Sequence, residues 1–138
     1  MTLHIADLKV GDALPERRHT PTNVSLFLYN AAVWNAHRIH YDEPYTKEVE
    51  RHPGIVIDGP LQGDWLAQCV MNWLGDDGVL LRFAYSNRIA TYLGETLVSG
   101  GRITAVDAAQ RRVDIELFVK NGGGDVTSPG SATVQLAS

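Results

Sequence analysis

A change in hydrophobic period divides this chain of 138 residues into two halves. Between Leu61 and Leu74, apolar residues recur every three or four positions, which is the spacing of a helix. They cover so much of the circumference that the helix is expected to be buried. From Gly78 onward apolar and polar residues alternate, which is the spacing of strands. The expected strands are 79–85, 95–106, 112–119 and 132–136, with turns at 94, 107–110 and 121–124.

This pattern predicts an α+β fold in which an antiparallel sheet wraps one central helix. The helix is expected to begin near Gly59 and to stop at Gly75. A chain of this length buries roughly two-thirds of its unfolded surface, which is enough for one core and too little for two. We therefore expect a single domain over residues 1–138.

The first half of the chain predicts one further helix. It should follow Pro21, be capped by Thr20 or Thr22, and end near Trp34 or Asn35. Apolar residues at helical spacing form one face of it: Val24, Phe27, Leu28, Ala31 and Ala32. A short amphipathic turn is expected at 45–51, and Pro53 and Gly54 then break the chain before the central helix.

Composition excludes several classes of partner. The formal charge is −4, from 12 basic and 16 acidic residues, and no basic cluster is present, so we expect no nucleic-acid partner. The longest apolar runs are a few residues, so no membrane span is expected. The first seven residues lack the layout of a secretory signal, which predicts a cytoplasmic protein. A single cysteine, Cys69, excludes an internal disulfide and is expected to be a buried, unreactive thiol.

The densest group of chemically active side chains lies at 34–42, just after the first helix. It contains Asn35, His37, Arg38, His40 and Asp42. Histidine transfers protons well near neutral pH, so one interpretation is a catalytic loop; the other is a solvated polar loop whose histidines are incidental. No metal site is expected, because the remaining histidines are scattered and structural zinc needs four ligands. No cofactor is expected either.

A second motif lies at 53–61, where Gly59 opens the central helix. The first N–H groups of a helix have no intrahelical partner, so Gly59 can offer its N–H to a ligand oxygen and stabilise a developing oxyanion. The alternative is a plain turn and cap, with Pro60 as a first-turn residue. The glycines at 122–124 are not followed by the Lys-Ser/Thr of a phosphate loop and are interpreted as a hairpin turn.

Together the two motifs resemble the MaoC-like hydratases and dehydratases of the hot-dog superfamily. The resemblance is carried by the runs 40–45 (HYDEPY) and 53–61 (PGIVIDGPL) and by the stretch 82–98, whose end contains YLGETL, and it spans nearly the whole chain. It implies a hot-dog fold and activity on enoyl- or 3-hydroxyacyl-thioesters of coenzyme A or acyl carrier protein. Asn35 stands where the family has an aspartate, and Asp58 where it often has a histidine. The string from Asn35 to Asp42 resembles the type 2 hydroxyacyl-thioester dehydratase branch, in which asparagine is an expected variant.

The resemblance implies roles for individual residues. His40 would activate a water, Asn35 would orient it, and the Gly59 N–H would bind the thioester oxygen. Asp58 would lie near the substrate as a compensating carboxylate or cap the helix. His37 and Arg38 would support the loop or reach a phosphate of the carrier.

The resemblance also implies a homodimer, because hot-dog domains pair so that acyl chains enter at the subunit boundary. The alternative is a heteromer with another MaoC-like subunit, in which this chain would be the active partner or a silent structural half. A competing activity is acyl-thioester hydrolysis, with Asp64 on the central helix as base or nucleophile.

Overall fold

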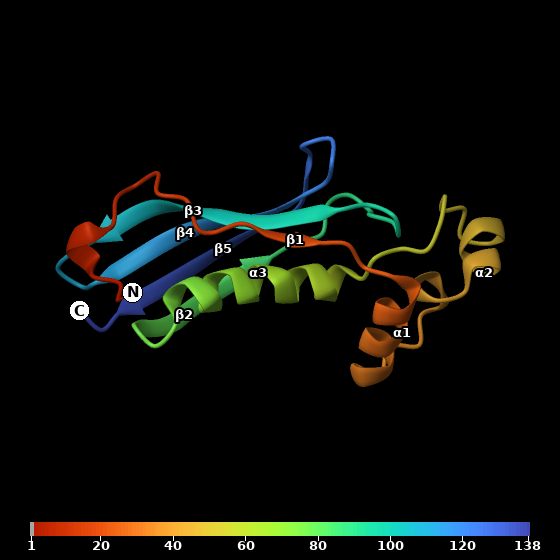
Figure 1. The fold of residues 1–138 in the computed structure, drawn as a ribbon, viewed down its shortest axis with the longest axis horizontal. Coiled ribbons are helices and arrows are strands. Elements are labelled where there is room, and N and C mark those ends of the chain that lie inside the picture. Colours follow the sequence, from red (N-terminus) through yellow and green to blue (C-terminus); the bar gives the residue numbers. More distant parts are fainter. Residues whose placement is uncertain (1) are drawn as a thin grey trace.

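The computed structural model describes residues 2–138. Its strands form one antiparallel sheet in the order β1-β3-β4-β5-β2, and helix α3 lies along one face of that sheet (Figure 1). The strands are β1 (Arg17–His19), β2 (Gly78–Tyr85), β3 (Leu97–Asp107), β4 (Arg112–Lys120) and β5 (Val126–Leu136). The α+β prediction of a sheet wrapped around one helix is confirmed.

Helix α3 (Gly59–Leu74) has the predicted bounds and is followed by Gly75 at φ +55°. Glycine adopts this left-handed conformation without strain, so the chain can turn from the helix into β2. The helix buries Trp65, Leu66, Cys69, Val70 and Leu74 against the sheet, where they meet the inward residues of the strands: Ile103, Val113, Ile115, Leu117, Val119, Val134 and Leu136. Cys69 is 2% exposed, as predicted, and burial raises the pKa of its thiol. None of the described helices has the length and apolar character needed to cross a membrane.

Three predicted strands match the structure to within two residues at either end, but β5 starts at Val126 instead of the predicted Ala132. The early part of β5 contains Pro129 and Gly130, which are rare inside strands and therefore hid it. Gly130 has a packing reason: a Cβ there would lie 2.9 Å from the carbonyl oxygen of Ala84 on β2. The glycine thus permits β2 and β5 to approach closely.

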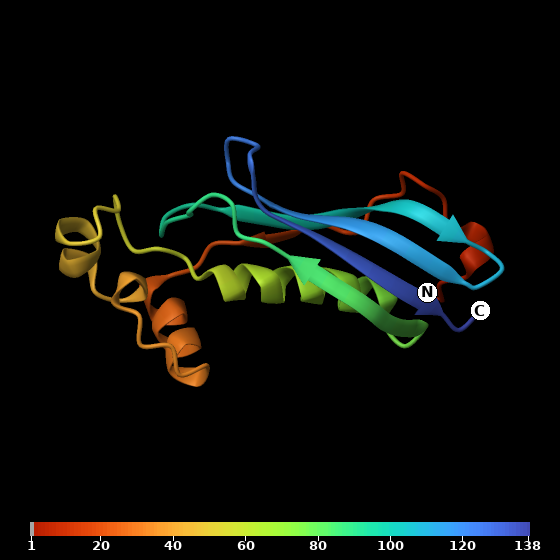
Figure 2. The same cartoon turned by 180° about the vertical axis from the view of Figure 1, so that it is seen from behind.

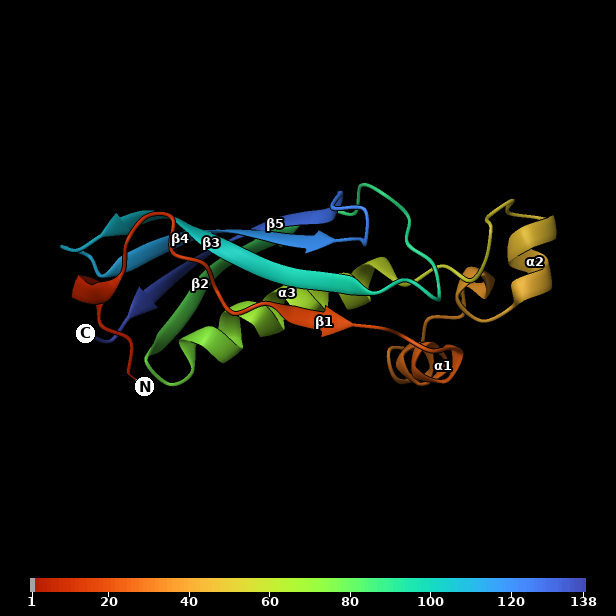
Figure 3. The ribbon, with the colours of Figure 1, turned by 45° about the horizontal axis from the view of Figure 1, so that its top comes forward.

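Helices α1 (Asn23–Ala32) and α2 (Glu43–Glu48) lie beyond the N-terminal end of α3, away from the body of the sheet (Figures 2 and 3). Thr22 caps α1 as predicted, because its side chain accepts a hydrogen bond from the Ser25 N–H. The inward side of α1 carries Leu26 and Asn30, its only buried residues. The predicted apolar face is exposed in the single chain, since no strand reaches it; Phe27, for example, is 61% exposed.

Candidate active site

The loop that carries His40 is fixed to the segment leading into α3. Val56 N–H donates to the Ile39 carbonyl at 2.9 Å, and Ile57 N–H donates to the Thr91 carbonyl at 2.8 Å. Residues 55–57 therefore lie as an extended segment between the loop and the chain before β3. These backbone bonds set the position of His40 relative to the start of α3.

The imidazole of His40 has a defined orientation and is 7% exposed. Its Nδ1 lies 2.7 Å from the Val56 carbonyl oxygen. A carbonyl oxygen only accepts hydrogen bonds, so Nδ1 carries a proton and donates it. The other nitrogen, Nε2, lies 3.4 Å from Oδ2 of Asp58. The backbone contact therefore leaves Nε2 as the nitrogen that can gain or lose a proton.

Asp58 is a carboxylate with no exposed surface. Its Oδ1 accepts a hydrogen bond from Asn30 Nδ2 at 3.0 Å, and its Oδ2 accepts one from Asn35 Nδ2 at 3.4 Å. It precedes α3, yet its side chain makes no capping bond to the helix backbone. Within the part of the chain that the structure describes, His40 is the one basic side chain that pairs with it.

Asn35 reaches Asp58 because of the way α1 ends. Trp34 adopts a left-handed conformation at φ +57°, its N–H donates to the Ala31 carbonyl, and the Asn35 N–H donates to the Asn30 carbonyl at 2.9 Å. This pair of bonds is the Schellman motif, which usually has glycine at the left-handed position. The turn directs the Asn35 amide back towards Asp58, and the His37 N–H fixes it further by donating to Asn35 Oδ1 at 3.1 Å. The structure thus brings together Asn35, His40 and Asp58.

Gly59 follows Asp58 directly and is the first residue of α3. The partial positive charge at a helix N-terminus makes its N–H a suitable donor to an oxyanion. A Cβ at this position would overlap the side-chain amide of Asn87, whose Oδ1 accepts a hydrogen bond from Ser128 Oγ at 2.9 Å. Glycine is therefore needed here for space, because the anchored Asn87 amide lies against its Cα.

The structure places His37 and Arg38 at the edge of this group. His37 is exposed, its Nδ1 accepts a bond from the Ile39 N–H, and its ring centroid lies 5.8 Å from that of His40. The Arg38 guanidinium donates twice to Asp42, at 3.0 and 2.7 Å, and lies 4.0 Å from the centre of the Tyr45 ring. The hydrogen bond from Arg38 lowers the pKa of the Asp42 carboxyl group. A role for His37 or Arg38 in binding the carrier stays a prediction.

An apolar cavity of about 200 Å³ opens beside Asn35. It is lined by residues of α1 and of the loop that follows: Phe27, Asn30, Ala31, Trp34, Asn35, Ala36 and Tyr41. Two of these lining residues, Asn30 and Asn35, hydrogen-bond to Asp58. The Oδ1 of Asn30 is buried and has no hydrogen-bond partner among the described residues. The cavity therefore shares Asn30 and Asn35 with the polar group around Asp58.

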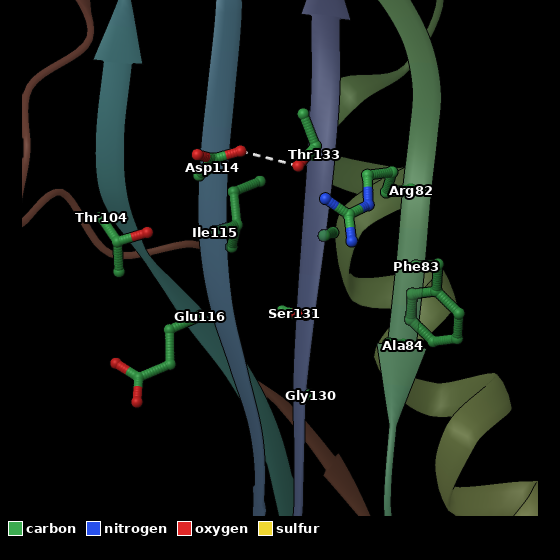
Figure 4. Close-up of a pocket in the computed structure, with 11 residues that line it drawn as sticks. Arg82, Phe83, Ala84, Thr104, Asp114, Ile115, Glu116, Gly130, Ser131 and Thr133 are labelled. Atoms are coloured by element: carbon green, nitrogen blue, oxygen red, sulfur yellow. Dashed lines mark hydrogen bonds between the residues drawn. The ribbon is translucent and has the colours of Figure 1, made fainter.

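A larger cavity, of about 340 Å³, lies elsewhere, on the face of the sheet turned away from α3 (Figure 4). Strands β2, β4 and β5 line it with Arg82, Asp114, Glu116 and Thr133, and Thr133 donates to Asp114 at 2.6 Å. Its lining contains no histidine, lysine or cysteine, so it offers no group suited to proton transfer near neutral pH. Across residues 2–138, no cluster of three or more potential ligand side chains could hold a metal ion.

Two parts of this site were not predicted from the sequence. Asn30 was missed because the apolar residues on the other sides of α1 suggested a different inward face; its position four residues after the buried Leu26 was the available signal. Asn87 lies between β2 and β3 in a stretch without a recognisable motif. Its proximity to Gly59 depends on tertiary packing and has no local signature.

A curled antiparallel sheet around one helix, with a histidine loop meeting the start of that helix, defines the MaoC-like hot-dog class. The chain belongs within it to the family described as hydroxyacyl-thioester dehydratase type 2, whose model matches residues 8–93, more than half of the sequence.

Two curated relatives match shorter stretches. Mesaconyl-C(4)-CoA hydratase of Chloroflexus aurantiacus is 48% identical over 52 residues, which are 38% of this chain and 18% of that protein. The mitochondrial hydroxyacyl-thioester dehydratase type 2 of Schizosaccharomyces pombe is 43% identical over 42 residues, which are 30% of this chain and 14% of that protein. The matches therefore span less than a fifth of the length of either relative.

Solved structures share the fold over nearly the whole chain. A MaoC-like dehydratase superposes with a TM-score of 0.89 at 25% identity, covering 99% of this chain and 43% of the other. The (R)-hydratase from A. caviae involved in PHA biosynthesis gives 0.85 at 16% identity, covering 94% and 98%. The ChsH1-ChsH2 complex from Mycobacterium tuberculosis gives 0.81 at 16% identity, covering 93% and 98%. These likenesses confirm the predicted hot-dog fold.

Proposed function

We propose that this chain catalyses the reversible hydration of enoyl-thioesters to 3-hydroxyacyl-thioesters, by acid–base catalysis at His40. The observation that carries the proposal is the orientation of His40: Nδ1 is bonded to the Val56 carbonyl, and Nε2 faces Asp58. Membership of the hydroxyacyl-thioester dehydratase family supports the same reaction. The thioester carrier is coenzyme A or acyl carrier protein.

In the hydration direction, Nε2 of His40 takes a proton from water while the water oxygen bonds to C3 of the enoyl group. The electron pair of the C2–C3 double bond moves towards the thioester carbonyl, and the proton returns from the imidazolium to C2. Water is thereby added across the double bond, and dehydration is the reverse path. Asn35 orients the water through Oδ1, which has a lone pair beyond the one that accepts the His37 N–H.

Negative charge develops on the thioester oxygen as the water oxygen attacks C3. In this proposal the Gly59 N–H, at the positive end of α3, donates to that oxygen. Gly59 is the first residue of α3, so its N–H is the outermost donor of the helix. Pro60, which follows, has no N–H and offers no competing donor beside it. Loss of one such donor typically costs about 2.7–4 kcal/mol of transition-state stabilisation.

We place the acyl group in the apolar cavity beside Asn35. Its lining includes Asn30 and Asn35, which bond to Asp58 of the proposed reaction centre, and the apolar residues Phe27, Ala31 and Trp34. Pockets for drug-sized ligands usually have volumes of about 300–1,000 Å³, and this cavity has about 200 Å³. The proposal therefore favours short acyl groups.

The decisive experiment is incubation of the purified protein with crotonyl-CoA. Hydration removes the enone absorbance without releasing thiol. Replacing His40 by alanine should lower kcat/KM about 100-fold or more, because a positioned acid–base group contributes about 100- to 10,000-fold. Asn35→Ala should cause a smaller loss. The control is His4→Ala, at an exposed histidine bonded to Ser138. Undiminished turnover in His40→Ala would contradict the assignment.

The same assay tests thioester hydrolysis, the competing activity. Hydrolysis would release free thiol, and Asp64 was its candidate base or nucleophile. Asp64 is exposed, and its Oδ2 accepts a hydrogen bond from Tyr29 Oη at 3.2 Å. The outcome that favours hydrolysis is thiol release that disappears in Asp64→Asn.

We further propose that two copies of the chain associate through β2. This strand pairs with β5 on one side only, and its exposed side chains include Val79 and Leu81, at 57% and 43%. An unpaired, apolar strand edge favours pairing with a second edge. A heteromer with another MaoC-like subunit is the alternative. It is supported by the likeness of this chain to a chain of the ChsH1-ChsH2 complex, which has two differently named components.

A further inference from the structure

A carboxylate without exposed surface needs a reason to be there, because burying a charge is costly unless it is paired. Asp58 is such a group, with 0% exposure. Helix capping does not explain it, since its side chain makes no bond to the first turn of α3. A pair with lysine or arginine does not explain it either, because His40 is its basic partner within the described residues. What surrounds Asp58 is the proposed reaction centre.

We propose that Asp58 is the positioning carboxylate of the reaction and acts through His40 and Asn35. This inference rests on the proposed hydratase function and deepens it. Oδ2 of Asp58 lies 3.4 Å from both His40 Nε2 and Asn35 Nδ2, which belong to the two side chains assigned to the water. Oδ1 is held by Asn30 Nδ2 at 3.0 Å, so the carboxylate is fixed in place.

The charge of Asp58 has a defined effect on the proton transfer. When His40 takes a proton from water it becomes an imidazolium, and a carboxylate 3.4 Å away stabilises that cation. Burial strengthens the effect because little solvent screens the pair. In the proposed step Asp58 neither gains nor gives up a proton, so the step stays balanced: one proton leaves water, resides on Nε2, and is returned to C2.

Few other charged groups face His40. The His37 ring lies 5.8 Å away on the same loop, between centroids. The Arg38 guanidinium is bonded to Asp42 on the exposed side of that loop. From the α3 side the facing group is Asp58. Of the charged groups near His40, Asp58 should therefore have the largest effect on the protonation of the imidazole ring.

The test exchanges the two side chains that share the hydrogen bond between Asn35 and Asp58. Asp58→Asn keeps the shape of the side chain and removes its charge. It should lower kcat about 100-fold or more and move the acidic limb of the kcat/KM profile to lower pH, because an imidazolium without its carboxylate loses its proton more easily. The double variant Asn35→Asp/Asp58→Asn returns a carboxylate to the neighbouring position and should recover activity to within about 10-fold of the starting enzyme, since the charge again lies beside His40. Asp76→Asn, which removes an exposed carboxylate just beyond the end of α3, is the matched control.

Each outcome decides the proposal. Near-normal kcat in Asp58→Asn overturns it. A loss of activity that the double variant does not restore, with a lower melting temperature and an unshifted pH limb, assigns Asp58 to folding alone and also overturns it. Titration of the His40 ring by NMR gives a readout independent of turnover: its midpoint should move to lower pH in Asp58→Asn. If the unaltered chain hydrates no thioester while this shift occurs, the proposed function fails and the charge coupling between Asp58 and His40 stands.

Discussion

Single residues of the same type have contrasting environments in this fold, as His40 and His19 illustrate. His40 faces a buried carboxylate, whereas His19 on β1 stacks on Trp65 with ring centroids 4.1 Å apart, and its Nε2 lies 2.9 Å from Ser99 Oγ. Burial, and then the charge of Arg17, lower the pKa of His19 to about 4. The motif around His40 set it apart from His19 in the sequence, but the stacking and burial of His19 have no local signature.

His19 should make the stability of the protein sensitive to acid. Its pKa is about 6.5 in the unfolded chain and about 4 in the folded one, so the unfolded state binds a proton first as the pH falls. The contribution of neutral His19 to the free energy of unfolding is therefore fully present above pH 6.5 and is lost as the pH falls from about 6.5 to about 4. Melting temperatures across this range should fall less steeply in His19→Gln than in the unaltered chain. Parallel curves for the two proteins would contradict this prediction.

Also at the residue scale, the motifs pointed to residues that the structure brings close together, but not to how they are held. Asn35, His40, Asp58 and Gly59 were identified from two short strings, and the structure brings the three side chains together beside the start of α3. The role of Asp58 as a cap or as a nearby carboxylate was open, because capping is decided by side-chain geometry. Asn30 was not identified, since a polar residue on a largely apolar helix has no distinctive pattern.

At the scale of elements, strongly periodic segments were predicted well and helix orientation was not. Helix α3 and strand β4 have clean periods, and their predicted bounds are correct to within one residue. In α1 the period predicted a helix, but Val24 and Phe27 face away from the core. A hydrophobic helix face indicates that another group packs against it. The sequence does not show whether that group is the core, a ligand or another chain.

The exposed face of α1 gives a prediction about acyl length. Ala31 and Ala32 are both exposed, but only Ala31 lines the proposed acyl cavity. Ala31→Phe should fill part of the cavity and lower kcat/KM for a long enoyl-CoA about 10-fold or more, with a smaller loss for crotonyl-CoA, because steric exclusion grows with chain length. Ala32→Phe should leave the ratio between the two substrates unchanged. A uniform loss for all chain lengths in Ala31→Phe would contradict the acyl assignment.

At the scale of the whole molecule, the two edges of the sheet differ in character. Edge strand β1 is three residues long and consists of Arg17, Arg18 and His19, and short, charged edges resist pairing. Edge strand β2 has eight residues and exposes Val79 and Leu81. An edge of this length and composition is expected to be covered. In the proposed homodimer, two copies related by a twofold axis would cover it with the same strand, because a twofold interface is self-complementary.

The oligomeric state of the purified chain tests this arrangement. Light scattering coupled to gel filtration should give twice the chain mass of 15.1 kDa. The variant Val79→Lys/Leu81→Lys should elute as a monomer, because two like charges on each copy would meet across the axis. Val10→Lys, at a 66% exposed apolar residue outside both edges, should remain dimeric. A lysine variant of β2 that stays dimeric would exclude this edge as the interface. A chain that is monomeric before any substitution would exclude the homodimer, and co-purification with a second MaoC-like subunit would then be the expected route to a covered β2.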